Sequence, residues 1–122
     1  MSLTLVQVAI GGAVGAVLRY LTGMAALRLL GTAFPWGTLT VNVVGSFAMG
    51  VLAIWLSGGR LSPFLMTGVL GGFTTFSAFS LDAVNLWEKG QAGAAGLYLI
   101  ASVGLSVGAL IAGMALAKGI AS

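Results

Sequence analysis

The chain has 122 residues, of which 59% are hydrophobic and 6% are charged, with a mean hydropathy of +1.13 and a net charge of +3. A soluble domain usually carries a charged surface made from about a quarter of its residues, so the outer surface of this chain is expected to face lipid. The absence of cysteine and histidine excludes disulfides, thiol chemistry and nearly all zinc or copper sites. The chain has only two acidic residues, Asp82 and Glu88, which are too few for a carboxylate metal site or a catalytic carboxylate pair. Its cations are too sparse for a nucleic-acid-binding surface.

Four hydrophobic segments are long enough to cross a membrane as helices. A bilayer core about 30 Å thick needs roughly 20 apolar residues per helix, and residues 3–30, 36–55, 63–86 and 93–117 meet this requirement. The connections are short, and Trp36, Trp55 and Trp87 lie near the predicted helix ends, where an aromatic belt is expected. The sequence therefore predicts an all-α integral membrane protein, with a single four-helix transmembrane domain over residues 1–122.

The first segment carries a pair of glycines and one cation. Gly11 and Gly15 are four residues apart, which places both on one helix face and lets a neighbouring backbone approach closely. Arg19 follows one turn later. It either extends to a membrane interface or attracts anions toward a vestibule, and the first of these roles is the commoner one for arginine.

The second segment carries a polar stripe made of Thr38, Asn42 and Ser46, again at four-residue spacing. Polar residues in such segments face the protein interior or a cavity, and the Asn42 amide offers two N–H donors. Two interpretations remain open: the stripe forms interhelical hydrogen bonds that hold the helices together, or it lines a polar path.

The third segment contains a run of residues that does not favour a helix. Two adjacent glycines, Gly71 and Gly72, come just before Thr74 and Thr75 near the middle of the segment, and both residue types are poor helix formers. A helix break at membrane depth frees backbone carbonyls, which must then face protein, water or an ion. The alternative is a continuous helix whose hydroxyls bond back to the preceding turn.

Two phenylalanines and two serines follow this run. Phe76 and Phe79 are three residues apart and so share one helix face, and Ser77 and Ser80 share an adjoining face. A phenyl ring has an electropositive edge, so rings presented edge-on can line an anion path without trapping the ion as a full cation would. The alternative is that both rings are ordinary lipid-facing or core aromatics.

The fourth segment carries two further hydroxyls. Ser102 and Ser106 are four residues apart, beside Gly104 and Gly108, and Tyr98 precedes them by one turn. Taken alone, a serine pair on a glycine-rich face indicates close helix packing as readily as a binding surface.

The cations are almost evenly divided between the two predicted membrane sides. Arg60 and Lys118 lie on one side, and Arg28 and Lys89 on the other, with Arg19 further inside the first helix. The positive-inside rule then gives almost no orientation preference. Either another signal orients the chain, or the chain inserts both ways and assembles as an antiparallel dimer.

Three blocks of sequence, taken together, resemble the Fluc/CrcB family of fluoride channels. They are GGAVGAVLRY at residues 11–20, FPWGTLTVNVVGSFAMG at residues 34–50 and GVLGGFTTFSAFS at residues 68–80. The blocks occur in the family's order and spacing, and the likeness covers essentially the whole chain. The combination of GTLxVNxxG with GGxTTFSxF is much more specific than either block alone.

The resemblance implies a fold, a function and a set of partners. It implies a fluoride-selective passive channel in the bacterial inner membrane, a dual-topology antiparallel homodimer with two pores, and a third helix broken near the membrane midplane. It also implies a structural Na⁺ at the dimer interface. Fluoride, a second copy of the chain and membrane lipid are thus the expected partners, with no nucleic acid and no enzymatic activity.

The resemblance also assigns roles to particular positions. The Na⁺ would be held by the backbone carbonyls of Gly71 and Thr74, and Arg19 corresponds to the family's basic vestibule residue. Ala78 stands where many members have Ser or Thr, which removes one hydroxyl. The remaining assigned residues are expected along the anion pore: Thr38, Asn42, Phe76, Ser77, Phe79, Ser80, Ser102 and Ser106.

Two other functions compete with the channel. A small dual-topology multidrug or cation exporter also uses four short helices, but it needs a carboxylate inside the membrane, and the first helix has none; Asp82 and Glu88 are expected toward an interface. A non-transporting helical scaffold subunit would explain the glycines. It would not explain two phenylalanines beside two threonines.

Overall fold

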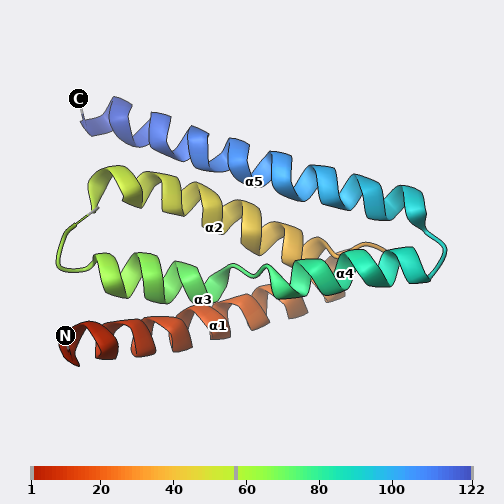
Figure 1. Ribbon diagram of the computed structural model, residues 1–122, viewed down its shortest axis with the longest axis horizontal. Coiled ribbons are helices and arrows are strands. Elements are labelled where there is room, and N and C mark those ends of the chain that lie inside the picture. Colours follow the sequence, from red (N-terminus) through yellow and green to blue (C-terminus); the bar gives the residue numbers. More distant parts are fainter. Residues whose placement is uncertain (1, 57, 122) are drawn as a thin grey trace.

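The computed structural model describes residues 2–56 and 58–121, which form long helices joined by short turns (Figure 1). Helix α1 spans Ser2–Leu30, α2 spans Trp36–Trp55 and α5 spans Ala92–Ala121. The third hydrophobic segment holds three elements in succession: a π-helical stretch, η1, over Pro63–Leu70, then α3 over Gly71–Phe73 and α4 over Ser77–Glu88.

Four helical stretches are long and apolar enough to cross a membrane: Ser2–Leu30, Trp36–Trp55, Pro63–Glu88 and Ala92–Ile120. This finding confirms the predicted all-α, four-span organisation. The helices run somewhat further than predicted at the carboxyl ends, since α4 ends at Glu88 and α5 at Ala121.

Glycine and proline set the ends of the helices. Gly90 follows α4 with φ +78°, a left-handed conformation that glycine adopts without a Cβ penalty. Its N–H donates to the Trp87 carbonyl, and the Gln91 N–H donates to the Leu86 carbonyl, both at 3.0 Å. This Schellman arrangement satisfies the last carbonyls of α4 and turns the chain directly into α5. Pro63 begins η1, where its missing N–H costs nothing.

The two chain ends lie at the same end of the molecule, beside the connection between α2 and η1 (Figure 1). The connections from α1 to α2 and from α4 to α5 lie toward the opposite end. Arg60 therefore lies at the same end as the two termini, whereas Lys89 belongs to the other end.

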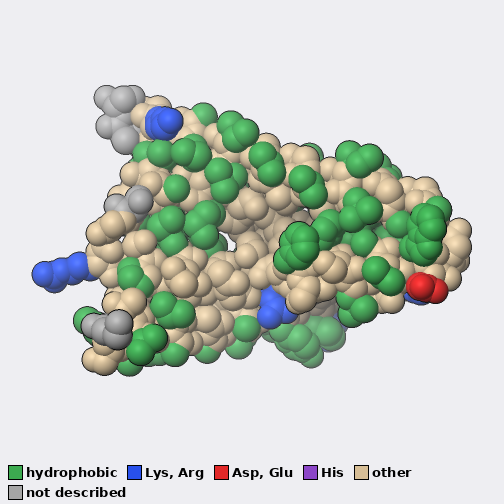
Figure 2. Space-filling model, in the orientation of Figure 1, with side chains coloured by type: hydrophobic (Ala, Val, Ile, Leu, Met, Phe, Trp, Pro, Cys, Tyr) green, Lys and Arg blue, Asp and Glu red, His purple; other side chains and the backbone are tan. Residues whose placement is uncertain are grey.

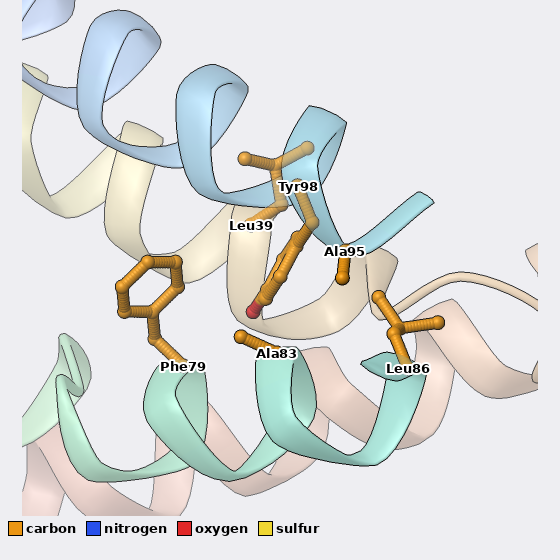
Figure 3. Close-up of a cluster of buried hydrophobic side chains, with 6 residues drawn as sticks. All are labelled: Leu39, Phe79, Ala83, Leu86, Ala95 and Tyr98. Carbon is orange, nitrogen blue, oxygen red and sulfur yellow. The ribbon is translucent and has the colours of Figure 1, made fainter. Parts of the chain in front are cut away.

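The buried hydrophobic cluster joins α2, α4 and α5 (Figure 3). Tyr98 of α5 is fully buried at its centre, and Phe79 and Leu39 pack beside it. The whole cluster consists of Leu39, Phe79, Ala83, Leu86, Ala95 and Tyr98. It fixes the second half of the third span against α2 and α5.

Glycines let α1 pack directly on the backbone of η1 and α3. A Cβ added to Gly15 would overlap the Val69 carbonyl oxygen, and one added to Gly11 would overlap the Phe64 carbonyl oxygen. The predicted role of this pair in close packing is therefore seen within the chain. Gly104 and Gly108 differ, because a Cβ added to either would meet nothing within 4 Å among the described residues.

Large apolar side chains cover the outside of the molecule, and Figure 2 shows them distributed along the whole of the visible face. Ile100 and Leu29, for example, are 75% and 81% exposed. A water-facing surface of this kind would aggregate, so this outer surface fits a lipid environment.

Candidate functional site

Residues 74–76 of the third span lie between α3 and α4, outside any regular helix. Eight residues of η1 and three of α3 precede this stretch, and the 12 residues of α4 follow it, so it lies near the middle of the span. Thr74 is extended, with φ −85° and ψ 158°. The α4 end of the stretch is capped by Thr75, whose hydroxyl accepts the Ala78 N–H at 3.2 Å.

Asn42 of α2 pairs with the backbone in this stretch. Its Nδ2 donates to the Thr75 carbonyl at 2.9 Å, and its Oδ1 accepts the Thr75 N–H at 2.8 Å. The amide side chain thus replaces the two helical hydrogen bonds that Thr75 lacks, as buried backbone groups require. One of the two Nδ2 hydrogens remains after this pairing.

Arg19 of α1 also reaches the backbone of the third span. Its Nε donates to the Gly72 carbonyl at 3.0 Å, and the side chain is half-buried. Arg19 therefore binds the carboxyl end of α3, where a cation complements the unpaired carbonyls and the helix dipole. Extension of Arg19 to an interface and attraction of anions both remain predictions.

The two carbonyl oxygens that were predicted to hold Na⁺ lack a hydrogen-bond partner among the described residues. Across residues 2–56 and 58–121, neither the Gly71 nor the Thr74 carbonyl oxygen accepts a hydrogen bond from another residue. Both residues line the same cavity. Such oxygens need a partner from water, an ion or a second chain.

The cavity beside these carbonyls, here called the Ser102 cavity, has a volume of about 430 Å³. The hydroxyl oxygens of Ser102 and Ser106 are buried, and neither has a hydrogen-bond partner in the part of the chain that the structure describes. An unpaired buried hydroxyl costs free energy, so each of these oxygens needs a partner that the described residues do not supply. Its lining gathers seven of the predicted site residues: Asn42, Gly71, Thr74, Phe76, Phe79, Ser102 and Ser106.

The two phenylalanines form the start of an aromatic row. The ring centroids of Phe76 and Phe79 are 5.4 Å apart with an interplanar angle of 60°, an edge-on arrangement, and Phe79 lies 5.2 Å from Tyr98. Phe79 is 6% exposed, whereas Phe76 is 76% exposed. Most of the Phe76 side chain is therefore not covered by the described residues.

The Asp82 carboxylate of α4 lies among the helices. Asp82 accepts hydrogen bonds from the Thr38 hydroxyl at 2.7 Å and from the Tyr98 hydroxyl at 3.2 Å. It lines a second cavity of about 440 Å³, here called the Asp82 cavity, together with Arg19 and Lys89. From the sequence, Asp82 was expected toward a membrane interface. The polar residues Thr38 and Tyr98 on the neighbouring helices were the only indication in the sequence of its hydrogen-bond partners.

The predicted residues thus fall into three groups. Thr38 and Arg19 line the Asp82 cavity, whereas the seven residues named above line the Ser102 cavity. Ser77 and Ser80 line neither and are exposed; the Ser80 hydroxyl bonds back to the Phe76 carbonyl at 3.0 Å, as a serine in a helix commonly does. Their assignment to the anion path stays a prediction.

The family described as CrcB-like protein, Camphor Resistance (CrcB), matches residues 6–114. The chain belongs to the CrcB-like family. Three relatives of similar length carry the name "Fluoride-specific ion channel FluC". One from Cereibacter sphaeroides is 64% identical over 118 residues, covering 95% of each chain. One from Rhizobium johnstonii is 57% identical, covering 95% of this chain and 97% of its own, and one from a Ruegeria species is 56% identical, covering 98% of each.

The three blocks quoted above lie within the part of the chain that matches the CrcB-like family. The resemblance read from them is therefore confirmed. The relatives are named as ion channels rather than as enzymes.

Proposed function

We propose that this CrcB-like chain forms a fluoride-selective passive channel in the bacterial inner membrane. The names of its relatives support this function at 56–64% identity over nearly the full chain. The observation that carries it is the Ser102 cavity, whose lining includes Phe79 and two buried hydroxyls that have no hydrogen-bond partner among the described residues.

The lining of this cavity suits fluoride chemically. Fluoride is small and strongly hydrated, so a pore must replace its water with directed donors and must not hold it with a full positive charge. The Ser102 and Ser106 hydroxyls donate hydrogen bonds, and the remaining Asn42 N–H can do the same. The electropositive edges of Phe76 and Phe79 add a weaker attraction along the same path.

The exposed position of Phe76 supports assembly of two copies. A ring that is 76% exposed beside a polar cavity leaves that cavity open on one side. An antiparallel, dual-topology homodimer would close it with a second copy of the chain and would produce two equivalent pores. The balanced cations at the two ends of the molecule fit insertion in either direction.

The Gly71 and Thr74 carbonyl oxygens would hold the Na⁺ that the family resemblance implies. Oxygen ligands suit a hard cation, and these two oxygens have no hydrogen bond from the residues that the structure describes. The two copies of a dimer would contribute four such oxygens. When bound, the ion supplies positive charge that stabilises carbonyls which lipid cannot satisfy.

The test of this function is fluoride efflux from liposomes that contain the purified protein. A passive channel requires no ion gradient other than that of fluoride, and it makes efflux depend on a counter-ion path such as a potassium ionophore. We expect fluoride to leave only when the ionophore is present, at a rate that is independent of a proton gradient.

One observation favours a second candidate, a small proton-coupled exporter. Such an exporter needs a carboxylate within the membrane, and Asp82 is half-buried between Thr38 and Tyr98. This candidate predicts transport that requires a proton gradient and that stops in Asp82→Asn. If the protein is a channel, both the wild type and Asp82→Asn should release fluoride without a proton gradient.

A further inference from the structure

The first half of the third span is held by one continuous face of α1. Gly11, Gly15 and Arg19 follow one another at four-residue spacing, so they lie along one side of that helix. Gly11 lies against Gly68 and Gly15 against Val69 and Phe73. The Arg19 side chain is the last contact of this face, and it ends on the Gly72 carbonyl.

The irregular backbone is held from two sides. Arg19 binds Gly72, just before the extended residue Thr74, and Asn42 binds Thr75, just after it. The two side chains come from different helices, α1 and α2. The Thr74 carbonyl lies between the two contact points, and the Gly71 carbonyl lies one residue before the first of them.

We propose that Arg19 is a positioning residue, whose Nε–H bond to the Gly72 carbonyl fixes the backbone of residues 71–75 for ion conduction. This positioning of the backbone depends on the hydrogen-bond donor at Nε and not on the positive charge of the side chain. The two Nη groups have no hydrogen-bond partner among residues 2–56 and 58–121, and the side chain lines the Asp82 cavity. One side chain thus joins the irregular backbone to that cavity.

Three substitutions of Arg19 distinguish the effect of the hydrogen-bond donor from the effect of the charge. In glutamine, Nε2 is the same number of bonds from Cα as Nε is in arginine, so Arg19→Gln keeps a donor at that place and removes the charge. Arg19→Lys keeps the charge but places its nitrogen one bond further out. Arg19→Met matches the length of glutamine and has neither a donor nor a charge.

The first measurement is amide hydrogen exchange over residues 72–78 in the purified, lipid-reconstituted protein, with α5 as the internal reference. Loss of a hydrogen bond to a charged donor is expected to speed exchange at these amides by on the order of tenfold in Arg19→Met. Arg19→Gln should stay close to wild type, and Arg19→Lys should resemble Arg19→Met. Arg28→Met, an exposed residue on the same helix, is the matched control and should change nothing.

The second measurement is fluoride flux per assembled protein, and it alone rests on the proposed function. The order of flux should follow the order of protection from exchange, so Arg19→Gln should conduct more fluoride than Arg19→Lys. The reverse order, with Lys near wild type and Gln near Met, would assign Arg19 to attraction of anions and overturn the proposal, as would wild-type exchange in all three variants. If Arg19→Met does not assemble, the Gln and Lys comparison decides alone. A wild-type protein without fluoride flux would refute the proposed function, while the exchange data would still decide this inference.

Discussion

Asn42 shows how one side chain serves both the backbone and a cavity. Its amide satisfies both backbone groups of Thr75, at 2.8 and 2.9 Å, and the residue also lines the Ser102 cavity. A polar stripe in the sequence left structural and pore-lining roles open. The structure gives Asn42 the structural role directly, and the pore-lining role remains a prediction.

Asn42→Asp should abolish fluoride flux and lower the thermal stability of the assembled protein. The substitution places a carboxylate oxygen beside the Thr75 carbonyl, where Nδ2 now donates, so a hydrogen bond becomes a repulsion. The new negative charge also repels an anion where the dielectric constant is low. Flux per assembled protein and the melting temperature should be measured together, and a well-folded variant with normal flux would exclude Asn42 from the pathway.

Phe76→Ile and Phe79→Ile should each reduce fluoride flux by up to about tenfold, since isoleucine keeps apolar bulk but removes the electropositive ring edge. Phe76 makes few contacts within the chain, so its replacement should leave the fold intact. Phe47→Ile, on α2 and outside both cavities, is the control. If the rings serve packing alone, both variants would instead show fewer assembled proteins with undiminished flux in those that remain.

At the scale of the helices, the predictable features are those that depend on neighbours along the chain. The lengths of the hydrophobic segments predicted four spans, and the four-residue spacing of Gly11 and Gly15 predicted a close-packed helix face. The run from Gly71 to Thr75 indicated low helix propensity. The bond from Arg19 to Gly72 joins residues 53 apart in the sequence. Periodicity within one helix does not reveal which backbone group a neighbouring helix will present.

Asp82 illustrates the same limit. Its hydroxyl partners lie on α2 and α5, and one of them, Thr38, is 44 residues away. In the sequence Asp82 stands near the end of a hydrophobic segment, a position that normally indicates an interface. Its partners become identifiable only when the order of the helices around the third span is known.

The contact between α1 and the third span makes a prediction at this scale. Gly15→Ala should destabilise the protein by roughly 1–3 kcal/mol, because the added methyl group overlaps the Val69 carbonyl and cannot be accommodated without backbone movement. Gly12→Ala lies on the same helix, has open space around the added atom and should be tolerated. Melting temperatures of the two variants should differ in this direction; equal values would mean that α1 and η1 are not packed as described.

At the scale of the whole molecule, charge and topology fit one another. An even number of spans brings both termini to one end (Figure 1). Of the four cations near the helix ends, two lie at each end of the molecule. A chain that inserts in both directions requires few charges and no strong difference in positive charge between its two ends.

Dual topology can be tested with a single introduced cysteine, since the sequence contains none. Leu61→Cys lies in the connection between α2 and η1, where the native side chain is 54% exposed. A membrane-impermeant thiol reagent should label about half of the molecules from each side of sealed vesicles. Complete labelling from one side only would exclude the antiparallel assembly.

We propose above all that this molecule conducts fluoride and excludes chloride. The most direct test compares the efflux of the two anions from matched liposomes that contain the wild-type protein, with a potassium ionophore present to carry the counter-charge. We expect rapid and complete fluoride loss from every liposome that contains the protein, with chloride loss no faster than from protein-free liposomes. Comparable efflux of both anions, or no fluoride efflux from liposomes that contain assembled protein, would contradict the account.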